Sequence, residues 1–406
     1  MPLTSTGPLR EQIERALPAR PFTVDLWDGS RIASTENGAG PRFTVNSPRA
    51  LAHLMRAPGQ LGLSRAYVVG DVDVDDLEAV MRVVDGWEPP PIDGRTRARL
   101  MLAAARAMGI PRPPRAPRSE LRLEGKRHTR ERDALAVRHH YDVGNEFFAL
   151  FLDESMTYSC AIFSRGAETL EQAQETKLEL VCTKLALTAD DTVLDVGCGW
   201  GAFAIHAAKR HGSRVVGITL SPAQAELARR RVAEAGLSDR VEIRIADYRD
   251  LRGESFDAIA SIGMVEHVGE NRIDLYARQL AALLEPGGRL LNHGIARLRH
   301  TDPDPGSFND RYVFPDGETL QLSRVQLALE RAGFATHHVE GFASDYAETL
   351  RGWAVNLDRD LATAERLAGS ERLRVWRLYL RAARNAFLNG TISVYQVRAS
   401  LPAGPG

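Results

Sequence analysis

Beyond about Thr188 the chain alternates short apolar runs with amphipathic segments. The apolar runs have the length and composition of buried strands and occupy residues 192–198, 214–220, 241–247, 256–263 and 289–295. The amphipathic segments have helical spacing and occupy residues 202–210, 222–236 and 274–288. Regular alternation of strands and helices predicts an α/β fold with a doubly wound parallel sheet.

The N-terminal part of the chain has a different pattern. Residues 21–29 and 41–47 alternate apolar and polar positions as strands do. Residues 47–57 and 75–85 have helical spacing and begin with capping residues. This mixture predicts a small α+β unit, in which no catalytic constellation stands out.

Two Pro-rich stretches, EPPPIDG and GIPRPPRAP, follow this unit and indicate an interdomain connection. Between them, residues 97–108 have the pattern of a basic amphipathic helix. We therefore predict an N-terminal accessory domain over residues 1–118, which ends in a basic Pro-rich linker. A catalytic domain is predicted over residues 119–406.

The composition is that of a globular protein, with 406 residues, 44% hydrophobic and 26% charged. No apolar run has the length needed to span a bilayer, and the N-terminus lacks the apolar core of a secretion signal, so a cytoplasmic location is expected. The net charge of −1 conceals a basic block, because residues 95–132 contain twelve Lys or Arg and three Glu. Such a block suits an anionic lipid surface, a nucleic acid or simply a solvated linker.

The chain has three cysteines, Cys160, Cys182 and Cys198. Their spacing matches neither a metal-ligand motif nor a disulfide framework, so reduced thiols and no metal site are predicted.

The first strand of the alternating region ends in LDVGCGWG, residues 194–201, where three glycines allow a tight turn close to a ligand. The form D-x-G-x-G-x-G, which includes Asp195, resembles the class I S-adenosylmethionine (SAM) methyltransferases and implies a Rossmann-like fold. Most of these enzymes end the second strand in Asp or Glu, whereas this chain has Thr219, so Thr219 and Gln224 are expected to supply the hydrogen bonds. The fourth strand ends in SIGMVEHVG instead of Asn/Asp-Pro-Pro-Tyr, which argues against a nucleobase amine as the methyl acceptor.

Further motifs carry a more specific resemblance from about residue 130 to the end. HYDVGNEFFALFLDESMTYSCAIF, LDVGCGWG, GITLSPAQ, SIGMVEHVG, YVFPDG and RVWRLYLRAARNAFLNGTISVYQV resemble the cyclopropane-fatty-acid synthase family, which includes the mycolic acid methyltransferases. The N-terminal part is similar, more weakly, to the accessory domain of the members that act on phospholipids.

The resemblance implies SAM-dependent alkylation of a cis double bond in a phospholipid acyl chain, through a carbocation that loses a proton to a bound bicarbonate ion. The implied bicarbonate cradle and catalytic set is Cys160, Glu266, His293, Ile295 and Tyr346. The implied SAM-binding set is Tyr158, Ser159, Asp195, Gly197, Gly199, Thr219, Leu220, Gln224, Asp247, Tyr248 and Ile262. Each of these residues alone has an ordinary structural explanation, and it is their combination at strand ends that favours a site.

Several alternatives stay open at this stage. The same cation gives a cyclopropane, the leading product, or after a hydride shift a methylene or methyl branch. A SAM-dependent N- or O-methyltransferase for a small metabolite, and a SAM- or lipid-binding protein without catalysis, are the other classes considered. The expected partners are an unsaturated phospholipid, the anionic inner face of the cell membrane and, as in many family members, a second copy of the chain, with no nucleic acid.

Overall fold

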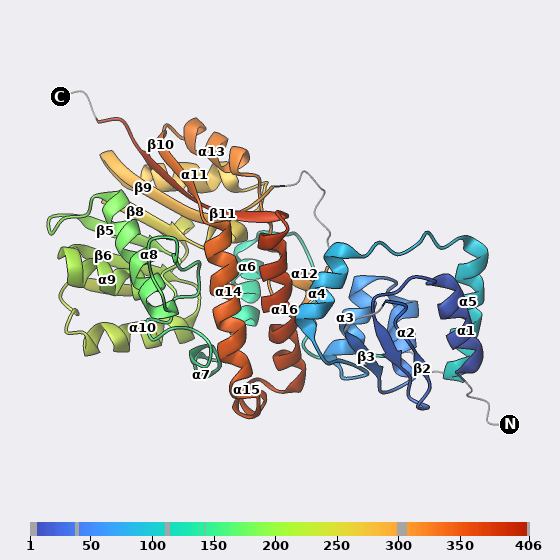
Figure 1. Ribbon diagram of the computed structural model, residues 1–406. Coiled ribbons are helices and arrows are strands. Elements are labelled where there is room, and N and C mark those ends of the chain that lie inside the picture. Colours follow the sequence, from blue (N-terminus) through green and yellow to red (C-terminus); the bar gives the residue numbers. More distant parts are fainter. Residues whose placement is uncertain (1–5, 37–39, 110–113, 142, 299–306, 404–406) are drawn as a thin grey trace. The chain divides into compact units, whose positions relative to one another are not determined.

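The computed structural model describes residues 6–36, 40–109, 114–141, 143–298 and 307–403, and the chain divides into two compact units (Figure 1). The first unit comprises Met1–Arg122, Pro305–Val313 and Ala368–Ala382, and the second comprises Leu123–Asp304, Phe314–Leu367 and Ala383–Gly406. The first unit therefore takes two segments from late in the chain, which its local sequence pattern did not indicate. Residues 110–113 of the predicted Pro-rich connection lie outside the described residues.

The first unit contains a small sheet with the strand order β2-β1-β3-β4, packed on short helices. Alternate apolar residues of the strands meet those of α2 and α3 in one core, which includes Ile32, Ala50 and Ala66. A second cluster joins α1 to α5 through Leu9 and Ala104. The elements are α1 (Gly7–Ala16), β1 (Thr23–Asp25), β2 (Arg31–Ile32), β3 (Arg42–Val45), α2 (Arg49–Arg56), α3 (Gln60–Val68), β4 (Val72–Val74), α4 (Leu77–Gly86), α5 (Gly94–Met108), α12 (Phe308–Tyr312) and the N-terminal part of α16 (Ser370–Leu388).

The second unit is built on a seven-stranded sheet with the order β10-β11-β9-β8-β5-β6-β7. Its strands are β5 (Thr192–Val196), β6 (Arg214–Thr219), β7 (Val241–Ile245), β8 (Phe256–Ile262), β9 (Leu284–Arg297), β10 (Ala335–Gly341) and β11 (Ile392–Ser400). Its helices are α6 (Arg130–Tyr141), α7 (Asn145–Ala149), α8 (Leu170–Leu185), α9 (Ala202–His211), α10 (Pro222–Glu234), η1 (Tyr248–Asp250), η2 (Val265–His267), α11 (Ile273–Ala282), α13 (Leu322–Arg331), α14 (Ala343–Asp358), α15 (Leu361–Ala368) and the end of α16.

Both faces of this sheet are covered by helices, as the alternating pattern predicted (Figure 1). One face packs on α11 and α13 in a core that includes Tyr276 and Leu329. The opposite face packs on α8, α9 and α10 in a core that includes Val181, Phe203 and Ala228. The α/β fold with a small N-terminal α+β part is confirmed.

Two features of the sheet differ from the local pattern. The strands β9, β8, β5, β6 and β7 are parallel, whereas β11 pairs antiparallel with both β9 and β10. The predicted helix over residues 274–288 is too long, because α11 ends at Ala282 and β9 begins at Leu284. Pro286 has no N–H for a helical hydrogen bond, and Gly287 has φ +79°, so this stretch cannot continue the helix. Among the described residues, no helix is both long and apolar enough to cross a membrane.

Candidate active site

A deep pocket opens at the carboxyl ends of the adjacent parallel strands β5, β6, β7 and β8, where ligands bind in folds of this kind. All eleven residues of the predicted SAM-binding set line this one pocket, although they are spread over more than a hundred positions of the sequence. They are Tyr158, Ser159, Asp195, Gly197, Gly199, Thr219, Leu220, Gln224, Asp247, Tyr248 and Ile262.

The glycine loop turns sharply between β5 and α9. Gly197 has φ +79° and Gly201 has φ +83°, which side chains with a Cβ rarely adopt. A Cβ on Gly201 would also lie 3.3 Å from the Cβ of Ala228, so glycine lets this loop pack on α10. The amides of Gly197 and Cys198 donate to the carbonyl of Ile218 at the end of β6, which holds the loop against the pocket floor.

Two separate groups of polar side chains line the pocket at the ends of β6 and β7. The Thr219 hydroxyl donates to Oε1 of Gln224 at 2.8 Å, and both residues are buried. Asp247 accepts two hydrogen bonds from the Arg249 guanidinium, at 2.8 and 2.6 Å, and this arginine also contacts Asp133 at 2.9 Å. The Thr219 hydroxyl and the Asp247 carboxylate expected from the sequence are thus present in the pocket. Gln224 already accepts from the hydroxyl, and Arg249 already donates to the carboxylate.

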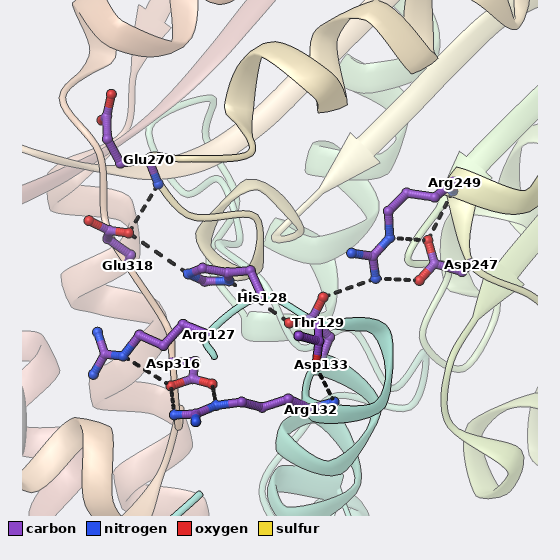
Figure 2. A network of polar contacts seen from close by, with 10 residues as sticks. All are labelled: Arg127, His128, Thr129, Arg132, Asp133, Asp247, Arg249, Glu270, Asp316 and Glu318. Carbon is purple, nitrogen blue, oxygen red and sulfur yellow. Dashed lines mark hydrogen bonds and ion pairs between the residues drawn. The ribbon is translucent and has the colours of Figure 1, made fainter. Parts of the chain in front are cut away.

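A network of ion pairs ties α6 and the segment before it to the pocket rim (Figure 2). Asp316 receives hydrogen bonds from Arg132 and an ion pair from Arg127 at 3.3 Å. Asp133, on the same helix as Arg132, reaches Arg249 on the opposite side of the network. Since Asp133, Arg249 and Asp316 all line the pocket, these pairs fix α6 as one of its walls.

A buried lysine that the sequence analysis missed lies at the centre of the site. Lys177 is 1% exposed, its Nζ donates to the Ser159 hydroxyl at 3.0 Å, and it lines the pocket. Burial lowers the pKa of Lys177 to about 8, against the opposing field of Asp153. Burial raises the pKa of Asp195 to about 7, and the nearby Lys177 charge holds it down. A lysine inside the buried stripe of a helix was the sequence signal for this group.

The Thr157–Phe163 segment is held between two helices. From α8, the Gln174 amide donates to the carbonyls of Thr157 and Ser159, at 3.2 and 2.9 Å. From α14, Asp345 accepts the Phe163 amide at 2.6 Å. The segment therefore has a fixed conformation that places Tyr158 and Ser159 in the pocket wall.

Cys160, within this segment, is fully buried. Its thiol donates to the carbonyl of Ala161 at 3.1 Å, and the Phe342 carbonyl lies 3.8 Å away. Burial, reinforced by Asp345, raises the pKa of Cys160 well above its ordinary value. A neutral thiol is a hydrogen-bond donor and a poor nucleophile.

Glu266 lies on η2, beside β9. Its Oε1 accepts the amide of Ile295 at 2.7 Å, while its Oε2 has no hydrogen-bond partner among the described residues. Burial raises the pKa of Glu266 to about 7. This contact requires Gly294, because a Cβ there would lie 2.3 Å from Cγ1 of Val265. The structure thus brings Glu266 and Ile295 together and gives the amide of Ile295 to the carboxylate.

His293 precedes Gly294 on β9, and its protonation is set by one residue of the strand β11 and one residue of the helix α8. Lys184 donates to Oε1 of Gln396 at 2.7 Å, so the Gln396 amide nitrogen faces Nδ1 of His293 at 3.1 Å and donates to it. Burial lowers the pKa of His293 to about 3. The ring is therefore neutral and carries its proton on Nε2, which has no partner among the described residues.

Tyr346, on α14, belongs to a row of aromatic side chains that starts at the pocket. Tyr158 lies 5.1 Å from Trp353, Trp353 lies 6.1 Å from Tyr346, and Tyr346 lies 4.7 Å from Phe387, measured between ring centroids. Phe148 packs on Tyr158 at 5.4 Å. The row is apolar apart from its phenol and indole groups.

The comparisons with known proteins agree with this architecture. The family model "Mycolic acid cyclopropane synthetase" matches residues 128–397. A probable fatty acid methyltransferase of Mycobacterium tuberculosis is 38% identical over 404 residues, covering 96% of this chain and 93% of that protein. The cyclopropane-fatty-acyl-phospholipid synthase of Escherichia coli K12 is 32% identical over 373 residues, covering 91% of this chain and 90% of that protein. The structure of mycolic acid cyclopropane synthase CmaA1 complexed with SAH and CTAB is 34% identical, with a TM-score of 0.62, and covers 66% of this chain and 98% of that chain.

The fold and the pocket, together with these matches, define a SAM-dependent methyltransferase. The chain belongs to the mycolic acid cyclopropane synthetase family. The family resemblance and the enzyme class expected from the sequence are thereby confirmed. The roles assigned to individual side chains stay predictions.

Proposed function

We propose that this enzyme transfers the methyl group of SAM to the cis double bond of an unsaturated fatty acyl chain of a membrane phospholipid. Two of the relatives support a lipid acceptor, since one is named a probable fatty acid methyltransferase and the other a cyclopropane-fatty-acyl-phospholipid synthase. The observation that carries the proposal is a buried donor and a buried acceptor, Nε2 of His293 and Oε2 of Glu266, with no partner among the described residues.

This donor and acceptor fit a bicarbonate ion, which presents both acceptor oxygens and one O–H. When bound, bicarbonate would supply the base for the proton that the alkylated chain must lose. His293 would donate through Nε2–H, and Glu266, when ionised, would accept the O–H. The Ile295 amide orients Glu266.

The reaction needs an apolar, aromatic environment because its intermediate is a carbocation on the acyl chain. The C–S bond to the methyl group breaks as the π electrons form the new C–C bond. Loss of a proton from the new methyl group closes a cyclopropane, the leading product, whereas a hydride shift before proton loss gives a methylene branch. The aromatic row from Tyr158 to Trp353 and Tyr346 offers ring faces that stabilise a cation.

The test is mass spectrometry of the fatty acids after the enzyme is incubated with SAM and oleoyl phospholipid vesicles. We expect a mass gain of one CH2, and proton NMR of the product distinguishes a cyclopropane from an exocyclic methylene. An exocyclic methylene signal would show that the product is the methylene-branched chain and not the cyclopropane. Formation of SAH only with a small polar acceptor would contradict the lipid assignment.

We further propose that α5 of the first unit docks on the anionic inner face of the membrane. Arg97, Arg99 and Arg106 are exposed on this helix, beside Met101 and Leu102, which are 39% and 51% exposed. Exposed basic and apolar side chains on one helix are typical of interfacial binding. The opposite face of α5 is occupied, because its alanines pack on Leu9.

The variant Arg97→Glu/Arg99→Glu should bind anionic vesicles at least about thirtyfold more weakly than the wild type in a flotation assay. Each arginine near such a surface contributes about 1 kcal/mol, and reversal replaces attraction by repulsion. The charge-matched control is Lys209→Glu/Arg230→Glu, on exposed positions of the second unit. Equal flotation of the two variants with anionic vesicles would rule out α5 as the docking element. So would wild-type protein that binds zwitterionic vesicles as well as it binds anionic ones.

A further inference from the structure

Helices α8 and α9 carry a cluster of metal-ligating side chains outside the pocket described above. Cys182 lies on α8, and His206 and His211 lie on α9. One ligand atom from each of the three, the thiol sulfur and a ring nitrogen of each imidazole, lie within 4.8 Å of one another. None of the three residues is among those that line the SAM pocket.

A carboxylate already lies between the two imidazoles. Oε2 of Glu179 is 3.0 Å from Nε2 of His206 and 3.2 Å from Nε2 of His211. Glu179 precedes Cys182 by three residues on α8, so both side chains project from the same helical face. The two ring nitrogens therefore converge on a single oxygen, as they would converge on a metal ion.

The cluster is enclosed on one side and reachable on the other. Cys182 is fully buried, and the side chains of His206 and His211 are 10% and 19% exposed. Glu179 is 46% exposed, and with His206 it lines a depression of the surface. An ion could thus enter beside Glu179.

We propose that Cys182, His206 and His211 bind a zinc ion, with Glu179 as the fourth ligand. Thiolate, imidazole and carboxylate together are the donor set of zinc sites, and four ligands match its tetrahedral preference. Zn–S and Zn–N bonds of about 2.3 and 2.0 Å place neighbouring ligand atoms about 3.3–3.7 Å apart, so small side-chain rotations would close the cluster on the ion. Binding releases the thiol proton to solvent, and each neutral imidazole binds through the ring nitrogen that carries no proton, with its one proton on the other nitrogen.

This site would fasten α8 to α9. α9 begins directly after Gly201 of the SAM loop, and α8 carries Lys177, so the ion would stabilise the scaffold of the SAM pocket without touching the reacting atoms. Zinc should therefore raise the thermal midpoint of the folded protein, as any ligand of the native state does.

The experiment uses the full-length protein, stripped of metal with a chelator and then titrated with Zn²⁺ in competition with a chromophoric chelator. We expect one zinc ion per chain, and a zinc affinity that falls at least about tenfold in His211→Gln, the loss typical of even outer-shell changes. His338→Gln, which removes an exposed histidine on β10, is the matched control and should bind as the wild type does.

Substitution with Co²⁺ tests the ligand identity. The wild type should show a thiolate-to-cobalt charge-transfer band and ligand-field bands of tetrahedral intensity, and Cys182→Ala should lose the first. If Cys182→Ala fails to fold, His211→Gln alone decides, because its side chain is partly exposed. A wild type that binds no zinc, binds it no better than His211→Gln, or gives no thiolate band overturns the proposal.

Discussion

Replacing Glu266 by glutamine should lower kcat by about 10²–10⁴-fold, the contribution typical of a positioned acid–base group, while the Kd for SAM stays unchanged. The amide keeps the shape of the side chain and can still accept the amide of Ile295, but it cannot become an anion. Glu266 does not line the SAM pocket, so binding of the cofactor should survive. The checks are SAH formation with oleoyl vesicles and calorimetric titration with SAM.

The pH dependence gives this prediction a second readout. The pKa of Glu266 is raised to about 7 by burial, so the ionised form that would accept the bicarbonate O–H grows as pH rises through 7, and wild-type kcat should rise with it. A carboxyl whose folded pKa is raised costs stability above its unfolded value of 4.5, since the folded state then binds more protons than the unfolded state. At pH 8 the Glu266→Gln variant should therefore be at least as stable as the wild type.

The control is Glu270→Gln, which changes a half-exposed carboxylate four residues later. It should leave the kcat and the pH profile as they are in the wild type. Near-normal turnover of Glu266→Gln, or a loss of kcat accompanied by a lower thermal midpoint at pH 8, would contradict the role assigned to Glu266.

Replacing Lys177 by methionine should destabilise the fold at pH 8, on the order of 1–3 kcal/mol. The buried Ser159 hydroxyl loses its donor, and the charge of Lys177 no longer offsets the burial of Asp195. Methionine has a similar volume, so the effect is electrostatic and not a cavity. The measurement is the denaturant midpoint of each variant at pH 8 and pH 6.

The sign of the pH effect follows from Asp195. Its pKa is already raised to about 7 by burial, and removal of the Lys177 charge raises it further. Below pH 7 Asp195 is protonated and neutral, so the charge of Lys177 no longer stabilises it. The loss of stability in Lys177→Met should therefore be smaller at pH 6 than at pH 8. Lys209→Met, an exposed lysine on α9, should change stability little at either pH. A deficit that is independent of pH would show that Lys177 acts by packing alone.

Much of the fold and of the SAM pocket could be predicted from local sequence. Periodicity identified the five parallel strands, since buried strands read as short apolar runs between helical segments. The resemblance to the methyltransferases named the pocket residues. Residues such as Asp195, Thr219 and Asp247 come together because the carboxyl ends of parallel strands meet at one edge of a sheet. The end of α11 was misplaced because helix boundaries depend on where a following strand begins to pair.

Other features were decided by contacts between distant segments. The tautomer of His293 depends on Gln396 and Lys184, from a strand added antiparallel to the sheet and from a helix of the opposite half of the chain. Local sequence could not pair Cys182 with histidines of the next helix, because ligand spacing across two helices is set by their packing. The sequence by itself therefore determined the five parallel strands of the sheet, the glycine loop and the residues at the strand ends, but not the antiparallel strands β10 and β11. Only the tertiary structure decided which buried groups have partners, because burial and pairing are properties of the packed core.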